Sequence, residues 1–150
     1  MCAITAAKRN KSILILEKSN KVGKKILMSG GGRCNFTNLF VEADHFLSNN
    51  PHFCKSALNK YTPYDFIAMV EKHNINYVEK NHHELFCEKS SKDILNMLLK
   101  ECREMDVLIE THTDIKEVSN NKNEGTLFPY QLKVITNSTH KHTVQCKSLV

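Results

Sequence analysis

The sequence predicts a mixed α/β fold, because a helix-forming segment, an apolar strand and an acidic residue follow one another near its start. Residues 1–9 are rich in alanine, which favours helix, and Asn10 is a plausible residue for that helix to end on. Residues 12–16 are mainly apolar and do not alternate, as expected of a strand buried on both faces. Glu17 follows this strand directly. Together these features are typical of the second half of a βαβ unit.

The remainder of the chain is predicted to hold two further helices and several strands. Residues 44–60 are expected to contain short helical pieces. A helix is predicted from a capping Thr62 to about His73, and another after Ser90, with Asp93 three positions on. The predicted strands are 77–79 and 84–87, joined as a hairpin, then 107–109, 115–118, 130–136 and 144–150, with polar turns at 120–125 and 137–138.

Size and composition fit one soluble globular domain. The 150 residues are 41% hydrophobic and 25% charged, and no run approaches the ~20 apolar residues of a membrane helix. The six cysteines include no CxxC pair and no signal peptide is visible, so free thiols in a reducing cytoplasm are expected. The net charge of +5 suits an anionic cofactor, while scattered acids and the absence of Trp argue against a nucleic-acid partner.

The most unusual segment is 29–38, in which Gly30, Gly31 and Gly32 stand side by side. Consecutive glycines let backbone N–H groups approach a phosphate or a flat ring closely. A plain flexible turn is the alternative, but three glycines followed by Arg33 are more than a turn needs. The segment is therefore a candidate ligand-contacting loop.

The acidic residue after the first strand is the second candidate. An acid at such a strand tip holds a ribose hydroxyl in dinucleotide-binding folds, although a plain surface acid is the alternative for Glu17. Lys18 and Lys24 belong to a cluster of lysines that could face either a pyrophosphate or solvent. Neither a GxGxxG turn nor a P-loop occurs in the chain.

Three segments carry a resemblance to a known family. They read Leu-Glu-Lys at 16–18, Val-Gly-Lys-Lys at 22–25 and Ser-Gly-Gly-Gly-Arg-Cys-Asn-Phe-Thr-Asn at 29–38. They resemble the BaiN/RdsA-like NAD(P)/FAD-dependent oxidoreductases, bacterial flavoproteins related to the glutathione-reductase type of FAD domain. The likeness continues at 50–54, 62–66, 85–87 and 90–93.

This resemblance implies a partial Rossmann-like FAD-binding domain with a helical segment and a small β-meander. The implied core comprises 1–44 and 106–150, and 45–105 is expected to be a mostly helical insertion. Family members are longer and begin with a strand and GxGxxG. The chain is therefore expected to be an N-terminal fragment, cut at both ends, that binds FAD weakly at best because the phosphate-receiving helix N-terminus is absent.

The resemblance also implies roles for single residues at the adenosine and pyrophosphate parts of FAD. Glu17 would accept hydrogen bonds from the ribose hydroxyls, and Lys18 and Lys24 remain candidates for the pyrophosphate. Ile115 matches the place where this fold contacts adenine through backbone atoms, and its side chain is expected in the core.

The glycine loop would lie along FAD, near its pyrophosphate and isoalloxazine ring. Arg33 would supply positive charge beside a phosphate or a reduced flavin, and Asn35 could donate and accept at the flavin edge. Cys34, next to this arginine, could have a lowered pKa, but a packing or cofactor contact is expected rather than a redox role. The implied cofactor-binding residues of the loop are Gly30, Gly31, Gly32, Arg33, Cys34 and Asn35.

The resemblance implies a fragment of an oxidoreductase that transfers hydride between NAD(P)H, the flavin and an unknown small-molecule substrate. The alternative is a non-enzymatic remnant, or a subunit that needs a complementary chain to bind FAD. No catalytic residue is identified. No metal site is predicted, because His82 and His83 are expected in an exposed turn and His140 and His142 on a surface strand.

Overall fold

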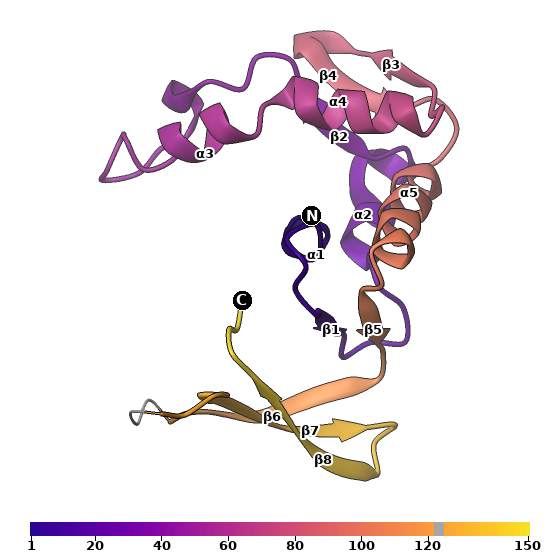
Figure 1. Ribbon diagram of the computed structural model, residues 1–150. Coiled ribbons are helices and arrows are strands. Elements are labelled where there is room, and N and C mark those ends of the chain that lie inside the picture. The colour runs from indigo at the N-terminus through magenta and orange to yellow at the C-terminus, as the bar shows by residue number, and fades with distance from the viewer. Residues whose placement is uncertain (122–124) are drawn as a thin grey trace. The chain divides into compact units, whose positions relative to one another are not determined.

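A computed structural model describes residues 1–121 and 125–150, which divide into two compact units (Figure 1). Unit 1 comprises Met1–Val22 and Cys102–Val150, and unit 2 comprises Gly23–Glu101. The domain division predicted from sequence stays a prediction, although residues 23–44 group here with the predicted insertion. The predicted polar loop at 120–125 lies partly outside the described residues.

Unit 1 contains a short parallel strand pair preceded by a helix. Helix α1 (Cys2–Ala7) buries Ile4, and the chain then turns through Asn10 in the left-handed conformation, as the helix-stop prediction requires. Strand β1 (Leu14–Leu16) pairs in parallel with β5 (Leu108–Glu110). The prediction that β1 is buried on both faces is wrong, because its sheet has two strands among the described residues and Leu14 stays 40% exposed.

The predicted β-meander also lies in unit 1. Strands β6 (Thr113–Asn120), β7 (Tyr130–Thr136) and β8 (His140–Cys146) form an antiparallel sheet in that order. The three-residue turn between β7 and β8 places Asn137 and Ser138 at positive φ, and the Thr139 N–H donates to the Thr136 carbonyl at 3.3 Å. The strand predicted at 144–150 therefore begins earlier and ends earlier, since pairing with β7 starts directly after this turn.

Unit 2 combines a three-stranded antiparallel sheet with helices, and helices make up most of the regular structure within residues 45–105. Its sheet has the order β2-β4-β3, and the predicted hairpin of β3 and β4 is confirmed. Its elements are α2 (Lys24–Met28), η1 (Ser29–Gly32), β2 (Asn35–Asn38), η2 (Ala43–His45), α3 (Lys55–Lys60), α4 (Pro63–Lys72), β3 (Tyr77–Glu79), η3 (Asn81–His83), β4 (Glu84–Cys87) and α5 (Ser91–Glu104), whose last turn belongs to unit 1.

Helix α4 begins where the sequence predicts, because Thr62 and Asp65 form a reciprocal capping box. Helix α5 also starts as predicted, with Ser90 Oγ accepting a hydrogen bond from the Lys92 N–H. Between these helices and the sheet lies the core of unit 2, which consists of Cys34, Val70, Cys87, Ile94 and Met97.

A buried ion-pair cluster joins α4 to α5 within unit 2. The carboxylate of Glu101 is 2% exposed and accepts from Lys72 Nζ and His73 Nε2, each at 2.8 Å. A buried carboxylate is tolerated only when such donors compensate its lost hydration. This cluster therefore fixes the end of α4 against α5.

Candidate functional site

The glycine loop of unit 2 is held tightly on one side and open on the other. Gly30 and Gly31 both adopt the left-handed conformation, with φ of 56° and 63°. A Cβ on Gly30 would lie 2.7 Å from the Asn35 backbone nitrogen and 2.7 Å from the Phe86 ring. A Cβ on Gly31 or Gly32 would meet nothing within 4 Å. The loop thus packs through its first glycine and leaves space beside the next two, where a flat or anionic ligand can approach the backbone.

Backbone hydrogen bonds close this loop and join it to the sheet. The Cys34 N–H donates to the Ser29 carbonyl at 3.1 Å, and the Cys87 N–H donates to the Arg33 carbonyl at 2.9 Å. Ser29 Oγ donates to the Ile26 carbonyl at 2.8 Å. The loop geometry is therefore set by the scaffold of unit 2, as a preformed binding loop requires.

The three residues after the glycines point to different surroundings. Arg33 is exposed, as its predicted role beside an anion requires, whereas Cys34 is buried in the core of unit 2. The Asn35 side-chain nitrogen donates to Glu84 Oε1 at 2.9 Å, across the pairing of β2 with β4. Arg33 is thus the charged side chain that this loop presents to solvent.

Cys34 shares the core with Cys87, a neighbour that sequence spacing did not indicate. Burial raises the pKa of the Cys87 thiol to about 11, and Cys34 adds to this rise. A thiol with a raised pKa is a poor nucleophile at neutral pH. Cys34 itself is 5% exposed and packs in this core, and its expected role toward a cofactor stays a prediction.

An aromatic ring beneath the loop is a second feature that sequence reasoning missed. The Phe86 ring lies against Gly30, and Lys80 Nζ lies 4.0 Å from its centroid. Lys24, the remaining predicted residue of unit 2, is exposed at the start of α2. Before it, a Cβ on Gly23 would come within 2.4 Å of Leu95, so this glycine permits close packing of α2 on α5.

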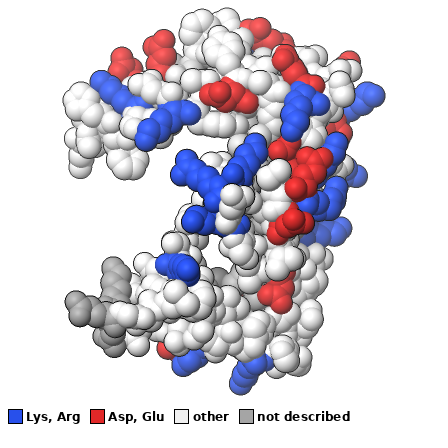
Figure 2. All heavy atoms as spheres, in the orientation of Figure 1, with Lys and Arg blue, Asp and Glu red and all other residues white. Residues whose placement is uncertain are grey.

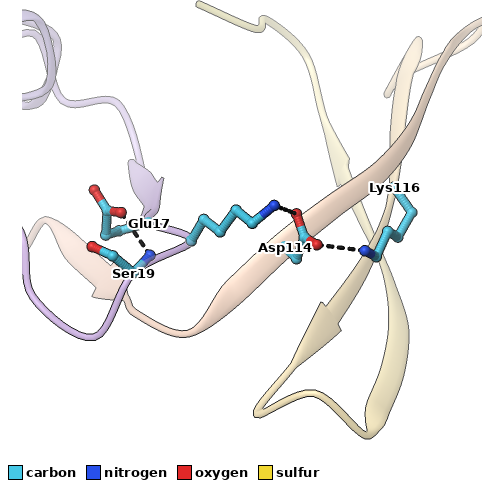
Figure 3. Close-up of polar contacts among 5 residues, drawn as sticks. Glu17, Ser19, Asp114 and Lys116 are labelled. Carbon is cyan, nitrogen blue, oxygen red and sulfur yellow. Dashed lines mark hydrogen bonds and ion pairs between the residues drawn. The ribbon is translucent and has the colours of Figure 1, made fainter.

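In unit 1, Glu17 follows β1 and its backbone is held on both sides. Its N–H donates to the Glu110 carbonyl at 2.8 Å, and its carbonyl accepts from the Thr113 N–H at 3.0 Å. One carboxylate oxygen, Oε1, accepts from the Ser19 N–H at 2.7 Å (Figure 3). The strand tip thus presents a half-buried, oriented carboxylate, as its predicted ribose-binding role requires.

Lys18 turns the other way and pairs with a carboxylate of β6. Its Nζ lies 3.2 Å from Asp114 Oδ1, and Lys116 contacts the other oxygen of the same carboxylate (Figure 3). Hydrogen bonds from Lys116 and then Lys18 lower the pKa of Asp114 below its usual 3.8. Lys18 is therefore engaged by an acid of its own unit.

Ile115 lies next to this pair on β6. Its side chain is 43% exposed, so the expectation that it belongs to the core is wrong. The β6–β7 register shifts between Ile115 and Glu117, and every later residue of β6 is exposed. The backbone role predicted for Ile115 toward adenine stays a prediction.

Two other features bear on function. In residues 1–121 and 125–150, no three His, Cys, Asp or Glu side chains gather as a metal site would need, although the rings of His140 and His142 lie 5.4 Å apart. His82 and His83 are exposed in η3, as predicted. None of the helices in the described part of the chain is long and apolar enough to cross a membrane.

The chain matches characterised relatives over most of its length. It is 44% identical over 126 residues to the ribosomal RNA dihydrouridine synthase of Escherichia coli, covering 84% of this chain and 32% of that protein. It is 43% identical over 149 residues to the enzyme of the same name from Haemophilus influenzae, covering 99% of this chain and 36% of that one. The chain thus spans about a third of the length of these two relatives.

A third relative carries a different name. The 3-dehydro-bile acid delta(4,6)-reductase of Clostridium scindens is 36% identical over 63 residues, which is 41% of this chain and 15% of that protein. Among solved structures, the THI4 protein of Thermovibrio ammonificans superposes with a TM-score of 0.59 at 10% identity, covering 97% of this chain and 49% of that one. This last likeness supports the fold.

The family model described as the HI0933-like protein Rossmann domain matches residues 1–150. The match confirms both the predicted fold class and the resemblance to the BaiN/RdsA-like proteins. The chain belongs to the HI0933-like family of Rossmann domains.

Proposed function

We propose that this chain forms the FAD-binding part of a flavin-dependent reductase that takes hydride from NAD(P)H. The observation that carries the proposal is the open side of the glycine loop, where Gly31 and Gly32 leave space beside their backbone. The family match and the oxidoreductase-type relatives support the same cofactor. Bound FAD would supply the hydride-transfer chemistry, which no protein side chain provides.

Residues with the chemistry that such a cofactor needs occur in both units, each set within its own unit. In unit 2, the loop backbone would lie against the cofactor and Arg33 would supply a fixed positive charge toward a phosphate or an anionic ring. In unit 1, Glu17 would accept a hydrogen bond from a ribose hydroxyl, because its carboxylate is already oriented by the Ser19 N–H.

We propose uracil in RNA as the acceptor of the hydride. Two relatives that match 84% and 99% of this chain are named ribosomal RNA dihydrouridine synthases. Dihydrouracil differs from uracil by two hydrogens across one ring double bond, which is a reduction that a flavin can perform. This substrate replaces the small molecule that the sequence alone favoured, and it departs from the sequence-based expectation of no nucleic-acid partner.

An FAD titration tests the cofactor proposal. Intrinsic FAD fluorescence measured against increasing protein should show saturable binding with a Kd below about 1 mM. Gly31→Ala should weaken it at least about tenfold, because the new methyl group occupies the space left for the cofactor. Glu17→Gln should weaken it less, since the amide retains a hydrogen-bonding oxygen.

Gly125→Ala is the matched control for Gly31→Ala. Gly125 also has a positive φ, of 89°, and a Cβ there would likewise meet nothing within 4 Å. Gly125 lies between β6 and β7, outside the glycine loop, so alanine at this position should leave FAD affinity unchanged. Absence of saturable binding, or equal effects of the two substitutions, would overturn the proposed role of the loop.

A further inference from the structure

Residues 45–64 of unit 2 form a segment that the proposed cofactor site does not use. It joins η2 to the start of α4 and includes α3. All but four of its residues are exposed. Four aromatic residues are among the exposed ones: Phe46 is 46% exposed, Phe53 81%, Tyr61 43% and Tyr64 66%. Burying an aromatic ring is favourable, so a partner that covered these rings would gain free energy.

The charged side chains within residues 45–64 are lysines, while Glu42, Asp44 and Asp65 lie close beside the segment in sequence. It contains Lys55 and Lys60 and no aspartate or glutamate, and it also includes His45 and His52. Figure 2 shows Lys and Arg side chains over α3, with uncharged residues and some Asp or Glu side chains close to them. Acids occur just outside the segment, and Asp65 is engaged in the capping box of α4. Lys55 and Lys60 are therefore the groups of segment 45–64 that suit contact with a polyanion.

Local hydrogen bonds give the segment a defined shape before any partner binds. Asn50 Oδ1 accepts from the His52 N–H at 3.0 Å, and the Asn50 carbonyl accepts from Ser48 Oγ and from the Phe53 N–H. Cys54 Sγ lies 3.8 Å from the Ala43 carbonyl and ties the turn back to η2. Aromatic rings on such an ordered turn lose little entropy when a base stacks on them.

We propose that segment 45–64 binds single-stranded RNA, with Phe53 as a stacking platform for a base and Lys55 and Lys60 as phosphate contacts. Aromatic rings interleaved with basic residues are the arrangement by which proteins hold single strands. The inference rests on the proposed function, because an enzyme that reduces uracil in RNA must hold the strand near the base it reduces. A second copy of this chain is the competing occupant of the same exposed rings.

The experiment measures binding of the full chain to a fluorescent oligouridine of about 12 nucleotides. Phe53→Ala should raise the Kd about five- to hundredfold, the range expected for loss of one stacked base. Phe128→Ala is the matched control, because Phe128 is a partly exposed aromatic residue of unit 1. The Phe128→Ala variant should bind oligouridine with the same affinity as the unsubstituted chain.

Salt dependence tests the lysines separately. The double variant Lys55→Gln/Lys60→Gln should lower the slope of log K against log salt concentration by about 1.4, since each phosphate contact on a single strand contributes about 0.7. Lys8→Gln/Lys11→Gln removes the same charge from exposed positions of unit 1 and should leave the slope as it was. An unchanged slope in the Lys55/Lys60 variant overturns the phosphate contacts.

Two further measurements separate the outcomes. FAD affinity should be the same in all of these variants. If Phe53→Ala leaves both oligouridine affinity and FAD affinity unchanged, the proposed RNA-binding role of segment 45–64 is wrong. The proposed cofactor function is then unaffected. Size-exclusion chromatography checks the competing occupant. If Phe53→Ala abolishes self-association and leaves oligouridine binding intact, the exposed rings belong to an interface between copies and the RNA proposal is wrong.

Discussion

Comparing the stability of Gly30→Ala with that of Gly31→Ala distinguishes the cost of close packing from the cost of backbone strain. The two glycines have nearly the same conformation, with φ/ψ of 56°/34° and 63°/33°, so alanine meets the same strain at both. The surroundings differ. A Cβ on Gly30 would lie 2.7 Å from the Asn35 nitrogen and from the Phe86 ring, whereas one on Gly31 would meet nothing within 4 Å.

The expected free energies follow from these contacts. Left-handed backbone costs an L-residue about 1–2 kcal/mol, and alanine recovers about 0.4–1 kcal/mol by restricting the unfolded chain. Gly31→Ala should therefore lower the free energy of unfolding by about 1 kcal/mol. Gly30→Ala should add an overpacking cost of about 1–3 kcal/mol, because the Asn35 backbone is held in β2 and Phe86 is buried.

Urea unfolding followed by far-ultraviolet circular dichroism measures this difference. With a slope of about 2 kcal/mol per molar urea, the midpoint of Gly30→Ala should lie about 0.5–1.5 M below that of Gly31→Ala. Gly30→Ala should cost less in a Phe86→Leu background than in the unsubstituted chain, because the ring contact is then relieved. Equal midpoints for the two single variants would refute the argument that packing selects glycine at position 30.

Three other outcomes are expected. Ile94 is 2% exposed in the core of unit 2, so Ile94→Ala should lower the free energy of unfolding, measured in urea, by about 2–5 kcal/mol. Leu47 is 97% exposed, so the control Leu47→Ala should change this free energy by less than about 0.5 kcal/mol. Thr62→Ala removes the capping box of α4 and should cost about 0.5–2 kcal/mol, so an unchanged urea midpoint would contradict the observed cap. The lowered pKa of Asp114 stabilises the fold above its unfolded value of 3.8, and this contribution is lost as the pH falls through the lower folded value. Asp114→Asn should therefore flatten the decline of the melting temperature in acid, and a parallel decline in both proteins would count against the lysine pairs.

Sequence signals predicted the structure best where the physical cause is local. The cap at Thr62, the cap at Ser90 and the polar turn at Asn137 and Ser138 each involve neighbours within a few residues, and all three are observed. The glycine run was recognised for a related reason, since only glycine adopts its conformation easily. Such features can be read from the chain because the partner groups stand close by in sequence.

Features that depend on distant residues could not be predicted in this way. The Phe86 ring beneath Gly30 and the neighbouring thiol of Cys87 both come from β4, far along the chain from the loop. The apolar run of β1 indicated burial, but burial depends on how many strands and helices cover it, and Leu14 remains partly exposed. The role of each candidate residue toward FAD also depends on the cofactor, so those roles stay predictions.

The pairing of β1 with β5 has a consequence for the order in which the chain folds. These strands flank the whole of unit 2 in sequence, so their hydrogen bonds close a long loop, whereas the contacts of unit 2 lie within one continuous stretch. Long-range pairing forms slowly when the intervening chain is disordered, because loop-closure entropy must be overcome first. Unit 2 should therefore acquire protection from hydrogen exchange before Leu14 and Leu108 do. Formation of the β1–β5 pair would then be the last step of folding, and its backbone amides would be the last to become protected from exchange during refolding.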